Sequence, residues 1–391
     1  MKIRKPIKAI AFVAAVGLTL SACAGTDAKD SGNADNGATN DDALTSQVEE
    51  DFDLDALIAA AQEEGPITIY DNSSAVEDMA AAFSEKYGIE ATGVKVDSSE
   101  ALEMVARESE SGNVQGDVIA IQDLPGLTNN LLPAGHVYSW IPGDLYDDIE
   151  ESQRDPLVMV SDPNFWSYNT EVYDSCPVDN VWAFTDEEWN GKVAMEDPAG
   201  ANKIIDWFSQ MDQFLQDDME VAYEDYFGTP YEGENAVQDW VIAMAENDPI
   251  LTDSNEDISA AVGAPGQTDP PMGLMASSKF RNVEEKGYYQ GVCEGIEPFV
   301  GIAAPKAIVI ATNSENQNAA KLYVHFAMTE EGIAPQIGDG KYSSNTSIVQ
   351  PDDPSEAGRH RENVFFFDNA GANVDWQMRQ DWQDLWRMSN K

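Results

Sequence analysis

Basic side chains are scarce in this sequence of 391 residues. It contains 22 Lys and Arg against 71 Asp and Glu, so its formal net charge is −49. A surface this negative repels the phosphates of nucleic acids and of anionic lipids, so we expect neither as a partner. The chain is nevertheless 42% hydrophobic, which excludes a disordered acidic polymer. Its length predicts two domains with substantial cores.

Long apolar runs are also lacking, except at the start of the chain. There a basic segment precedes the apolar run 9–20, which is too short to span a membrane and is typical of a secretory signal. The following Leu20-Ser21-Ala22-Cys23 resembles the lipobox of bacterial lipoproteins, in which the cysteine becomes the acylated N-terminus. An ordinary signal peptide with an incidental cysteine is the alternative.

This pattern predicts a lipoprotein signal peptide over 1–22 and acylation, for example with palmitate, at Cys23. Residues 23–50 are rich in Asp, Asn, Gly, Ser and Thr and predict a flexible tether. We therefore expect a protein that is anchored by lipid to the cell membrane and faces the cell wall or periplasm.

Cysteine and histidine are rare in the remainder. Only Cys176 and Cys293 follow Cys23, and such a pair in an exported protein predicts one disulfide; two separate buried thiols are the alternative. The three histidines do not show the spacing of metal ligands. We expect no metal site and no cofactor. The histidines are His136, His325 and His360.

Strand and helix patterns alternate in the first part of the tether-free chain. The predicted elements are a helix over 53–64, a strand over 67–70, a helix over 75–87, a strand over 91–96, a helix over 98–111, a strand over 117–121 and a short helix over 124–132. Such alternation indicates parallel βαβ units and an α/β fold. The middle region, about 156–298, alternates less regularly. Trp376, Trp382 and Trp386 follow helical spacing and predict a C-terminal helix that packs on its own protein.

Seven segments in a fixed order resemble the substrate-binding proteins of ABC importers, in the branch that binds iron(III), thiamine, polyamines and phosphonates. The segments are EEGPITIYDNSS (63–74), FSEKYGI (83–89), GDVIAIQD (116–123), SYNTEVY (167–173), EWNGKVAMEDPAG (188–200), GLMASSKFRNVEEKG (273–287) and NAAKLYVHFAMTEEGIAPQ (318–336). Together they span most of the chain after the tether.

The resemblance implies an α/β, two-lobe periplasmic-binding-protein-like fold of type II, with a hinge of two crossing strands near 157–168 and 299–310. The N-terminal lobe would comprise 51–156 and 299–391, and the C-terminal lobe 157–298. It further implies a monomer that captures a small solute between its lobes and delivers it to an ABC permease, without catalysis.

Candidate ligand-binding residues follow from the rule that ligands of open α/β sheets bind beyond the carboxyl ends of strands. The same loops carry the resemblance. Helix-start N–H groups with small residues favour a polar or anionic solute, such as a phosphorylated compound or a phosphonate; a plain N-cap is the alternative for each loop. The candidates are Asn72, Ser73, Ser74, Gln122, Asp123, Gly200, Ala201, Asn202, Ser277, Ser278 and Lys279.

Three alternatives remain open. Iron-binding relatives present a tyrosine pair where this chain has Ser277-Ser278, and its own pair, Tyr288-Tyr289, comes later. An iron(III) or iron-chelate binder is therefore the alternative within the family. A secreted hydrolase or a structural lipoprotein is the alternative outside it, although the sequence has no G-x-S-x-G, H-E-x-x-H or P-loop motif.

Overall fold

The structure is a computed structural model that describes residues 45–390. Its strands are β1 (Gln47–Glu49), β2 (Ile67–Asp71), β3 (Ala91–Lys95), β4 (Val118–Ile121), β5 (Val137–Tyr138), β6 (Trp140–Pro142), β7 (Val158–Tyr168), β8 (Val193–Glu196), β9 (Ile250–Thr252), β10 (Met272–Ala276), β11 (Gly291–Val292), β12 (Gly301–Ala311), β13 (Tyr342–Ser343) and β14 (Val364–Phe366). Its α-helices are α2 (Leu54–Ala61), α3 (Ala75–Tyr87), α4 (Ser98–Ser111), α5 (Leu124–Gly126), α6 (Asn202–Phe214), α7 (Gln216–Phe227), α8 (Ala236–Glu246), α9 (Asn255–Gly263), α10 (Asn282–Lys286), α11 (Gln317–Ala327), α12 (Glu330–Ile337), α13 (Ala357–His360) and α14 (Ala372–Ser389). The signal peptide, Cys23 and most of the tether lie outside the described residues.

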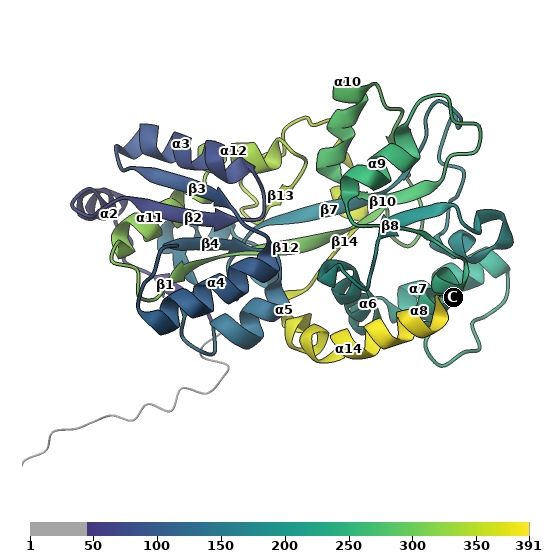
Figure 1. The fold of residues 1–391 in the computed structure, drawn as a ribbon, viewed down its shortest axis with the longest axis horizontal. Coiled ribbons are helices and arrows are strands. Elements are labelled where there is room, and N and C mark those ends of the chain that lie inside the picture. Colours follow the sequence, from purple (N-terminus) through teal and green to yellow (C-terminus); the bar gives the residue numbers. More distant parts are fainter. Residues whose placement is uncertain (1–44, 391) are drawn as a thin grey trace, which may run out of the picture. The chain divides into compact units, whose positions relative to one another are not determined.

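One continuous mixed sheet carries the fold, with the strand order β3-β2-β4-β12-β7-β10-β8-β9. The two long central strands, β7 and β12, pair antiparallel and join a first lobe around β2, β3 and β4 to a second lobe around β8, β9 and β10 (Figure 1). These are the two crossing strands that the sequence predicts. The α/β class and the two-lobe arrangement are confirmed.

The first lobe is built from the parallel βαβ units that the sequence predicts. β2 pairs parallel with both β3 and β4. Helix α3 ends at Gly88, whose φ of 70° is the left-handed conformation that glycine adopts without strain. Two separate clusters of buried apolar side chains include residues of these strands, one with Ile69 and Phe83 and the other with Tyr70 and Ile121. The strand ends are thereby held firmly in place.

The second lobe has one large core rich in tryptophan. Trp166, Trp207, Trp240, Trp382 and Trp386 all belong to it and are buried. Two of them, Trp382 and Trp386, come from α14 and pack around the Phe208 ring of α6. Helix α14 contacts α6 and α8. The aromatic stripe therefore packs on its own protein, as expected, although Trp376 is 37% exposed.

The lobe boundaries expected from the sequence remain a proposal, and these contacts suggest a change to them. The expected N-terminal lobe included 299–391, but its last helix packs more extensively on α6 and α8 of the second lobe than on α5 of the first. We therefore propose that α14 is part of the second lobe. Residues 47–49 of the expected tether form β1 and pair with β6.

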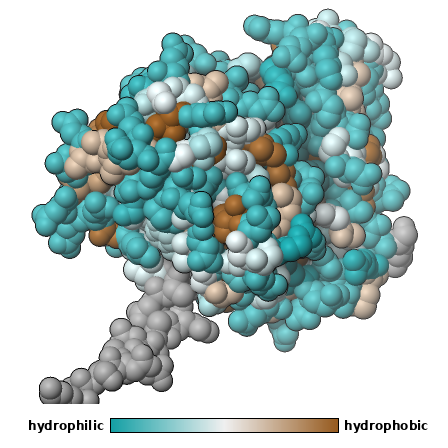
Figure 2. All heavy atoms as spheres, turned by 60° about the vertical axis from the view of Figure 1, so that its left-hand side comes forward, coloured by the Kyte–Doolittle hydropathy of each residue, from teal (hydrophilic) through white to brown (hydrophobic). Residues whose placement is uncertain are grey.

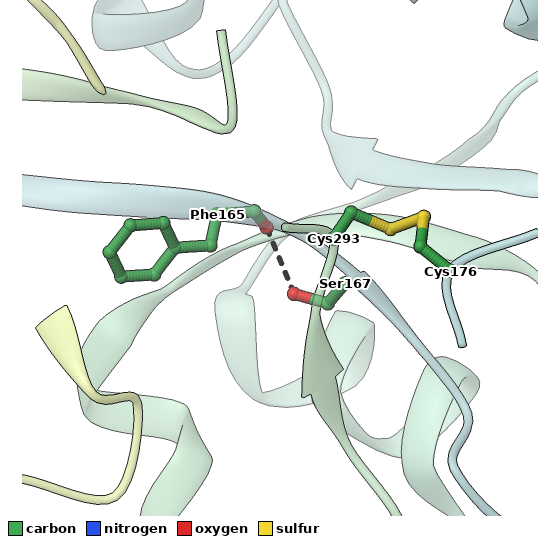
Figure 3. Close-up of a disulfide and its surroundings, with 4 residues drawn as sticks. All are labelled: Phe165, Ser167, Cys176 and Cys293. Atoms are coloured by element: carbon green, nitrogen blue, oxygen red, sulfur yellow. Dashed lines mark hydrogen bonds between the residues drawn. A yellow bond between two sulfur atoms is a disulfide. The ribbon is translucent and has the colours of Figure 1, made fainter. Parts of the chain in front are cut away.

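The structure joins Cys176 and Cys293 in a disulfide with an S–S distance of 1.98 Å (Figure 3). Cys293 is fully buried, and its backbone N–H donates to the carbonyl oxygen of Trp166 in β7. The disulfide thus fastens the segment after β7 to the chain just before the return strand. Among residues 45–390, no helix is both long and apolar enough to cross a membrane.

Candidate functional site

A cavity of about 290 Å³ lies between the two lobes. The first lobe contributes the ends of β2 and β4 and the start of α4, and the second lobe contributes the end of β8 and the start of α6. This is the strand-end position at which α/β folds bind ligands. The lining residues are Asn72, Asp97, Ser98, Ser99, Gln122, Asp123, Glu196, Gly200, Ala201, Asn202, Lys203 and Asp206.

A row of amide groups forms part of the wall. Asn72 donates from Nδ2 to Oε1 of Gln122 at 2.9 Å, and Gln122 donates from Nε2 to Oδ2 of Asp162 at 3.4 Å. The remaining acceptors, Oδ1 of Asn72 and Oδ1 of Asp162, are buried and lack a hydrogen-bond partner in the described chain. Buried polar atoms without partners are costly, so the oxygen of Asn72, which lines the cavity, is available to a donor on a ligand, whereas Asp162 does not line it.

Lys203 supplies a positive charge to the second-lobe wall. Its Nζ lies 2.8 Å from Oε2 of Glu196, and each side chain is 17% exposed. Burial lowers the pKa of Lys203, but Glu196 and Asp162 outweigh this effect and raise the pKa above its ordinary value. Burial raises the pKa of Glu196, and Lys203 outweighs it in the opposite direction. Both members of the pair are therefore charged.

Arg379 of α14 bridges two carboxylates of the cavity wall. Its Nη2 donates to Oδ1 of Asp123 at 2.6 Å and to Oδ2 of Asp206 at 2.7 Å, and its Nε donates to Oδ1 of Asp206 at 2.8 Å. Burial raises the pKa of Asp206 to about 7, although Arg379 acts to lower it. Arg379 is thus the counter-charge of two buried acids, one from each lobe. Because the pKa of Asp206 is about 7, partial protonation of Asp206 reduces the excess negative charge near neutral pH.

Two helices begin at this cavity, α4 from the first lobe and α6 from the second. The side chain of Asp97, which precedes α4, makes no cap hydrogen bond within the described residues. Ala201, which precedes α6, has no polar side chain that could make one. The first N–H groups of a helix carry partial positive charge and bind anions readily. The cavity therefore offers helix starts and Lys203 to a negative group.

Ser73 belongs to a hydrogen-bond network that contains two buried lysines. Lys341 donates from Nζ to Oγ of Ser73 at 3.2 Å and to Oε1 of Gln336 at 2.5 Å. Lys306 pairs with Asp71 at 2.6 Å, and both side chains are 1% exposed. Burial, together with the nearby Lys306, lowers the pKa of Lys341. Ser73 therefore makes a hydrogen bond to a buried lysine and does not line the cavity.

The structure brings together six of the eleven predicted ligand-binding residues and leaves five outside the cavity lining. The six are Asn72, Gln122, Asp123, Gly200, Ala201 and Asn202. The five are Ser73, Ser74, Ser277, Ser278 and Lys279. Ser277 is buried and donates to the backbone oxygen of Asp339 at 3.0 Å, while Lys279 pairs with Glu256 at 3.1 Å. β10 therefore ends at a contact with the segment before β13, away from the cavity.

Sequence reasoning missed Asp97, Ser98, Ser99, Glu196, Lys203 and Asp206, and also Arg379 behind the wall. A signal existed for several of them, since Ser98 begins a predicted helix and Glu196 ends a strand. No local signal marks Arg379, which lies 256 residues after its partner Asp123. The adjacent Tyr288 and Tyr289 do not line this cavity, and none of its described lining residues is a tyrosine.

The chain is similar in sequence and in fold to known proteins. The sequence profile described as bacterial extracellular solute-binding protein matches residues 78–363. Iron-bound HitA from Pseudomonas aeruginosa is similar in structure, with a TM-score of 0.63 and 15% identity over 84% of this chain and 100% of its own. The ferric binding protein from Campylobacter jejuni has a TM-score of 0.63 and 15% identity over 81% of this chain and 98% of its own.

A third similar structure is AfuA from Actinobacillus pleuropneumoniae with exogenous fructose-6-phosphate bound. Its TM-score is 0.61 and its identity 17%, over 83% of this chain and 99% of its own. No curated protein sequence matches the chain significantly. At such low identities the structural similarities establish the fold alone, and the expected type II fold is confirmed.

Proposed function

Because the chain belongs to the bacterial extracellular solute-binding proteins, we propose that it captures a small polar solute with an anionic group for an ABC importer. The observation that carries this proposal is the cavity between the lobes, to which both lobes contribute hydrogen-bonding and charged side chains. The protein performs no chemistry on the solute. It acts as a monomer, is tethered through acylated Cys23 outside the cell, and passes the solute to a membrane permease.

Closure of the lobes on the solute is the proposed mechanism. β7 and β12 connect the lobes, so a small change along these two strands opens or closes the cavity. The closed form is held by contacts between the lobes: Asn202 donates from Nδ2 to Oδ2 of Asp123 at 3.3 Å, and Arg379 bridges Asp123 and Asp206. A solute that adds contacts to both lobes stabilises this form, and the permease recognises it.

The charges of the wall favour an anionic group on one side of the solute. Lys203 and the start of α6 attract it, and the unpaired oxygen of Asn72 accepts a hydrogen bond from a hydroxyl or amino group. Asp97 is exposed at the wall, and its carboxylate has no hydrogen-bond or ion-pair partner within 45–390. A solute with an ammonium group facing Asp97 and a phosphonate, phosphate or carboxylate facing Lys203 fits both features.

An iron(III) chelate is the second candidate. Two of the similar structures are named as iron-binding, and four carboxylates line the cavity, from Asp97, Asp123, Glu196 and Asp206. Carboxylates are hard ligands that suit Fe(III). Three of the four are already paired with Lys203 or Arg379, which disfavours bare iron and leaves an iron complex with an organic anion.

A thermal-shift screen of the full chain tests the proposal. The panel contains ethylphosphonate, 2-aminoethylphosphonate, fructose 6-phosphate, 4-aminobutyrate, spermidine and ferric citrate. A solute at 100 times its Kd adds about 2.7 kcal/mol to the free energy of unfolding, which raises the melting temperature by several degrees. We expect a response to an anionic or zwitterionic member and none to spermidine. A response to spermidine alone would contradict the anionic preference.

A further inference from the structure

A second cavity, of about 430 Å³, lies in another part of the molecule. It shares no lining residue with the cavity between the lobes. Its wall includes Glu294, which follows β11, and Glu356 and His360, which lie at the two ends of α13. One ligand atom from each of these three side chains lies within 4.8 Å of the other two. We call this group the His360 cluster.

His360 is the unusual member of the cluster. Its side chain is 96% removed from solvent, since the residue is only 4% exposed, yet it lines the cavity. Neither ring nitrogen makes a hydrogen bond to any residue within 45–390. A buried imidazole normally has a partner for its N–H and its lone pair. The edge of the ring packs against Phe165 with centroids 5.5 Å apart, which fixes its orientation.

We propose that the His360 cluster binds a divalent transition-metal ion, for which Zn²⁺ is the probe. One imidazole nitrogen and two carboxylate oxygens are a donor set that Zn²⁺ accepts at about 2.0–2.2 Å, with the remaining position open to water. Donor atoms on one tetrahedral zinc ion stand roughly 3.4 Å apart. The separations of up to 4.8 Å must therefore shorten by up to about 1.4 Å, which the exposed Glu294 and Glu356 side chains permit.

The guanidinium of Arg359 forms ion pairs with both carboxylates of the His360 cluster. It donates to Glu294 at 2.9 Å and to Glu356 at 3.2 Å, and the three side chains are 60%, 49% and 65% exposed. Exposed ion pairs of this kind contribute little to stability, so they do not prevent a metal ion from replacing the guanidinium. Arg359 also keeps the carboxylates near each other before the ion arrives.

The site would correct the expectation of no metal, which rested on histidine spacing alone. Its ligands are 62 and 4 residues apart in sequence, since Glu294, Glu356 and His360 come from two segments that meet only in the folded chain. An ion here would fasten the segment next to the disulfide at Cys293 to the segment before α14. It would add stability to the second lobe without entering the solute cavity.

Zinc binding to chelator-treated full chain, purified without a histidine tag, tests the proposal. Titration calorimetry is run in excess Mg²⁺, because Mg²⁺ saturates the scattered carboxylates of so acidic a protein but competes poorly at an imidazole. We expect one Zn²⁺ per chain and a higher melting temperature with zinc. H360Q and the pair E294Q/E356Q should each weaken zinc binding more than about tenfold, since even groups behind the ligands typically cost 10- to 100-fold.

Two further variants serve as controls for the zinc titration. H136Q removes a half-buried imidazole that bonds to Ser109 elsewhere and should bind zinc as the wild type does. E294Q/E356Q leaves the buried ring in place, so it remains informative should H360Q unfold. Absence of stoichiometric zinc in the wild type, or equal zinc affinity in the wild type and E294Q/E356Q, would overturn the proposal.

Discussion

Arg379 and Asp123 form a buried ion pair, 2.6 Å between Nη2 and Oδ1, that joins the C-terminal helix to the end of β4. Their side chains are 11% and 7% exposed. Asp206 shares the same guanidinium from α6. Arg379 thus holds one carboxylate of each lobe at one point of the cavity wall. A change at Arg379 should therefore affect the stability of the protein and the relative position of the lobes at the solute site.

Removal of this cation should destabilise the protein strongly. Arg379→Met leaves two buried carboxylates without a counter-charge, and breaking a buried pair costs about 3–5 kcal/mol. Urea denaturation measures this loss. Arg387→Met, on the same helix but 52% exposed and paired with the exposed Asp384, should change the free energy of unfolding by less than about 0.5 kcal/mol. Equal effects of the two changes would contradict the structural role of Arg379.

Stability should depend on pH through Asp206. Its pKa is raised from an ordinary 3.8 to about 7, so the folded state holds the proton more tightly than the unfolded state. Its contribution to the free energy of unfolding is therefore complete below about pH 4 and is lost as the pH rises to about 7. The melting temperature of the wild type minus that of Asp206→Asn should fall across this range and stay constant above it. A difference that rises with pH would show that Asp206 ionises readily.

Lys203 should matter for solute binding as well as for stability, because it is also the counter-charge of the largely buried Glu196. Lys203→Met keeps the aliphatic length but removes the charge that faces the anionic group, and a charge-assisted hydrogen bond contributes about 1.5–3 kcal/mol. We expect affinity for the solute to fall about 10- to 100-fold by calorimetry. Lys192→Met, which removes a more exposed ion pair with Asp269, is the control and should bind normally. Unchanged affinity in Lys203→Met would remove this residue from the site.

Reduction should destabilise the protein through Cys176 and Cys293. They are 117 residues apart in sequence. A crosslink over that distance lowers the entropy of the unfolded chain and so stabilises the folded state by about 4–5 kcal/mol. A reducing agent should therefore lower the melting temperature of the wild type and leave that of Cys176→Ala/Cys293→Ala unchanged. A similar shift in both proteins would mean that the bond contributes nothing.

Local patterns predicted the secondary structure of the first lobe well. The expected helices over 75–87 and 98–111 are α3 and α4, because glycine ends both and the apolar spacing is regular. The packing of α14 was not predictable from such patterns. The tryptophan stripe indicates that the helix is covered, but its partners Phe208 and α8 are more than a hundred residues earlier, and no local rule selects between the two lobes.

The site was predictable where backbone topology decides it. Strand ends at Asn72 and Gln122 converge because the parallel strands β2 and β4 end at one edge of the sheet, and the start of α6 at Asn202 meets them from the second lobe, where β8 runs in the opposite direction. Charged residues of the wall were not predictable in the same way. Glu196, Lys203 and Asp206 are three of many ionisable side chains, and only folded contacts distinguish them. Ser277 lies outside this cavity because β10 ends beside Asp339, where its hydroxyl donates to the backbone oxygen of Asp339.

Substitutions at Gly200 show whether the solute binds in the cavity between the lobes. A methyl group built at Gly200 meets only the backbone oxygen of Asp197, at 3.9 Å, so larger side chains fit the backbone and enter the cavity. The measurement is calorimetric titration, with the solute found in the screen, of wild type, Gly200→Ala and Gly200→Phe. We expect wild-type binding in Gly200→Ala and loss of binding in a folded Gly200→Phe. Full affinity in Gly200→Phe would contradict it, because the solute would then bind elsewhere.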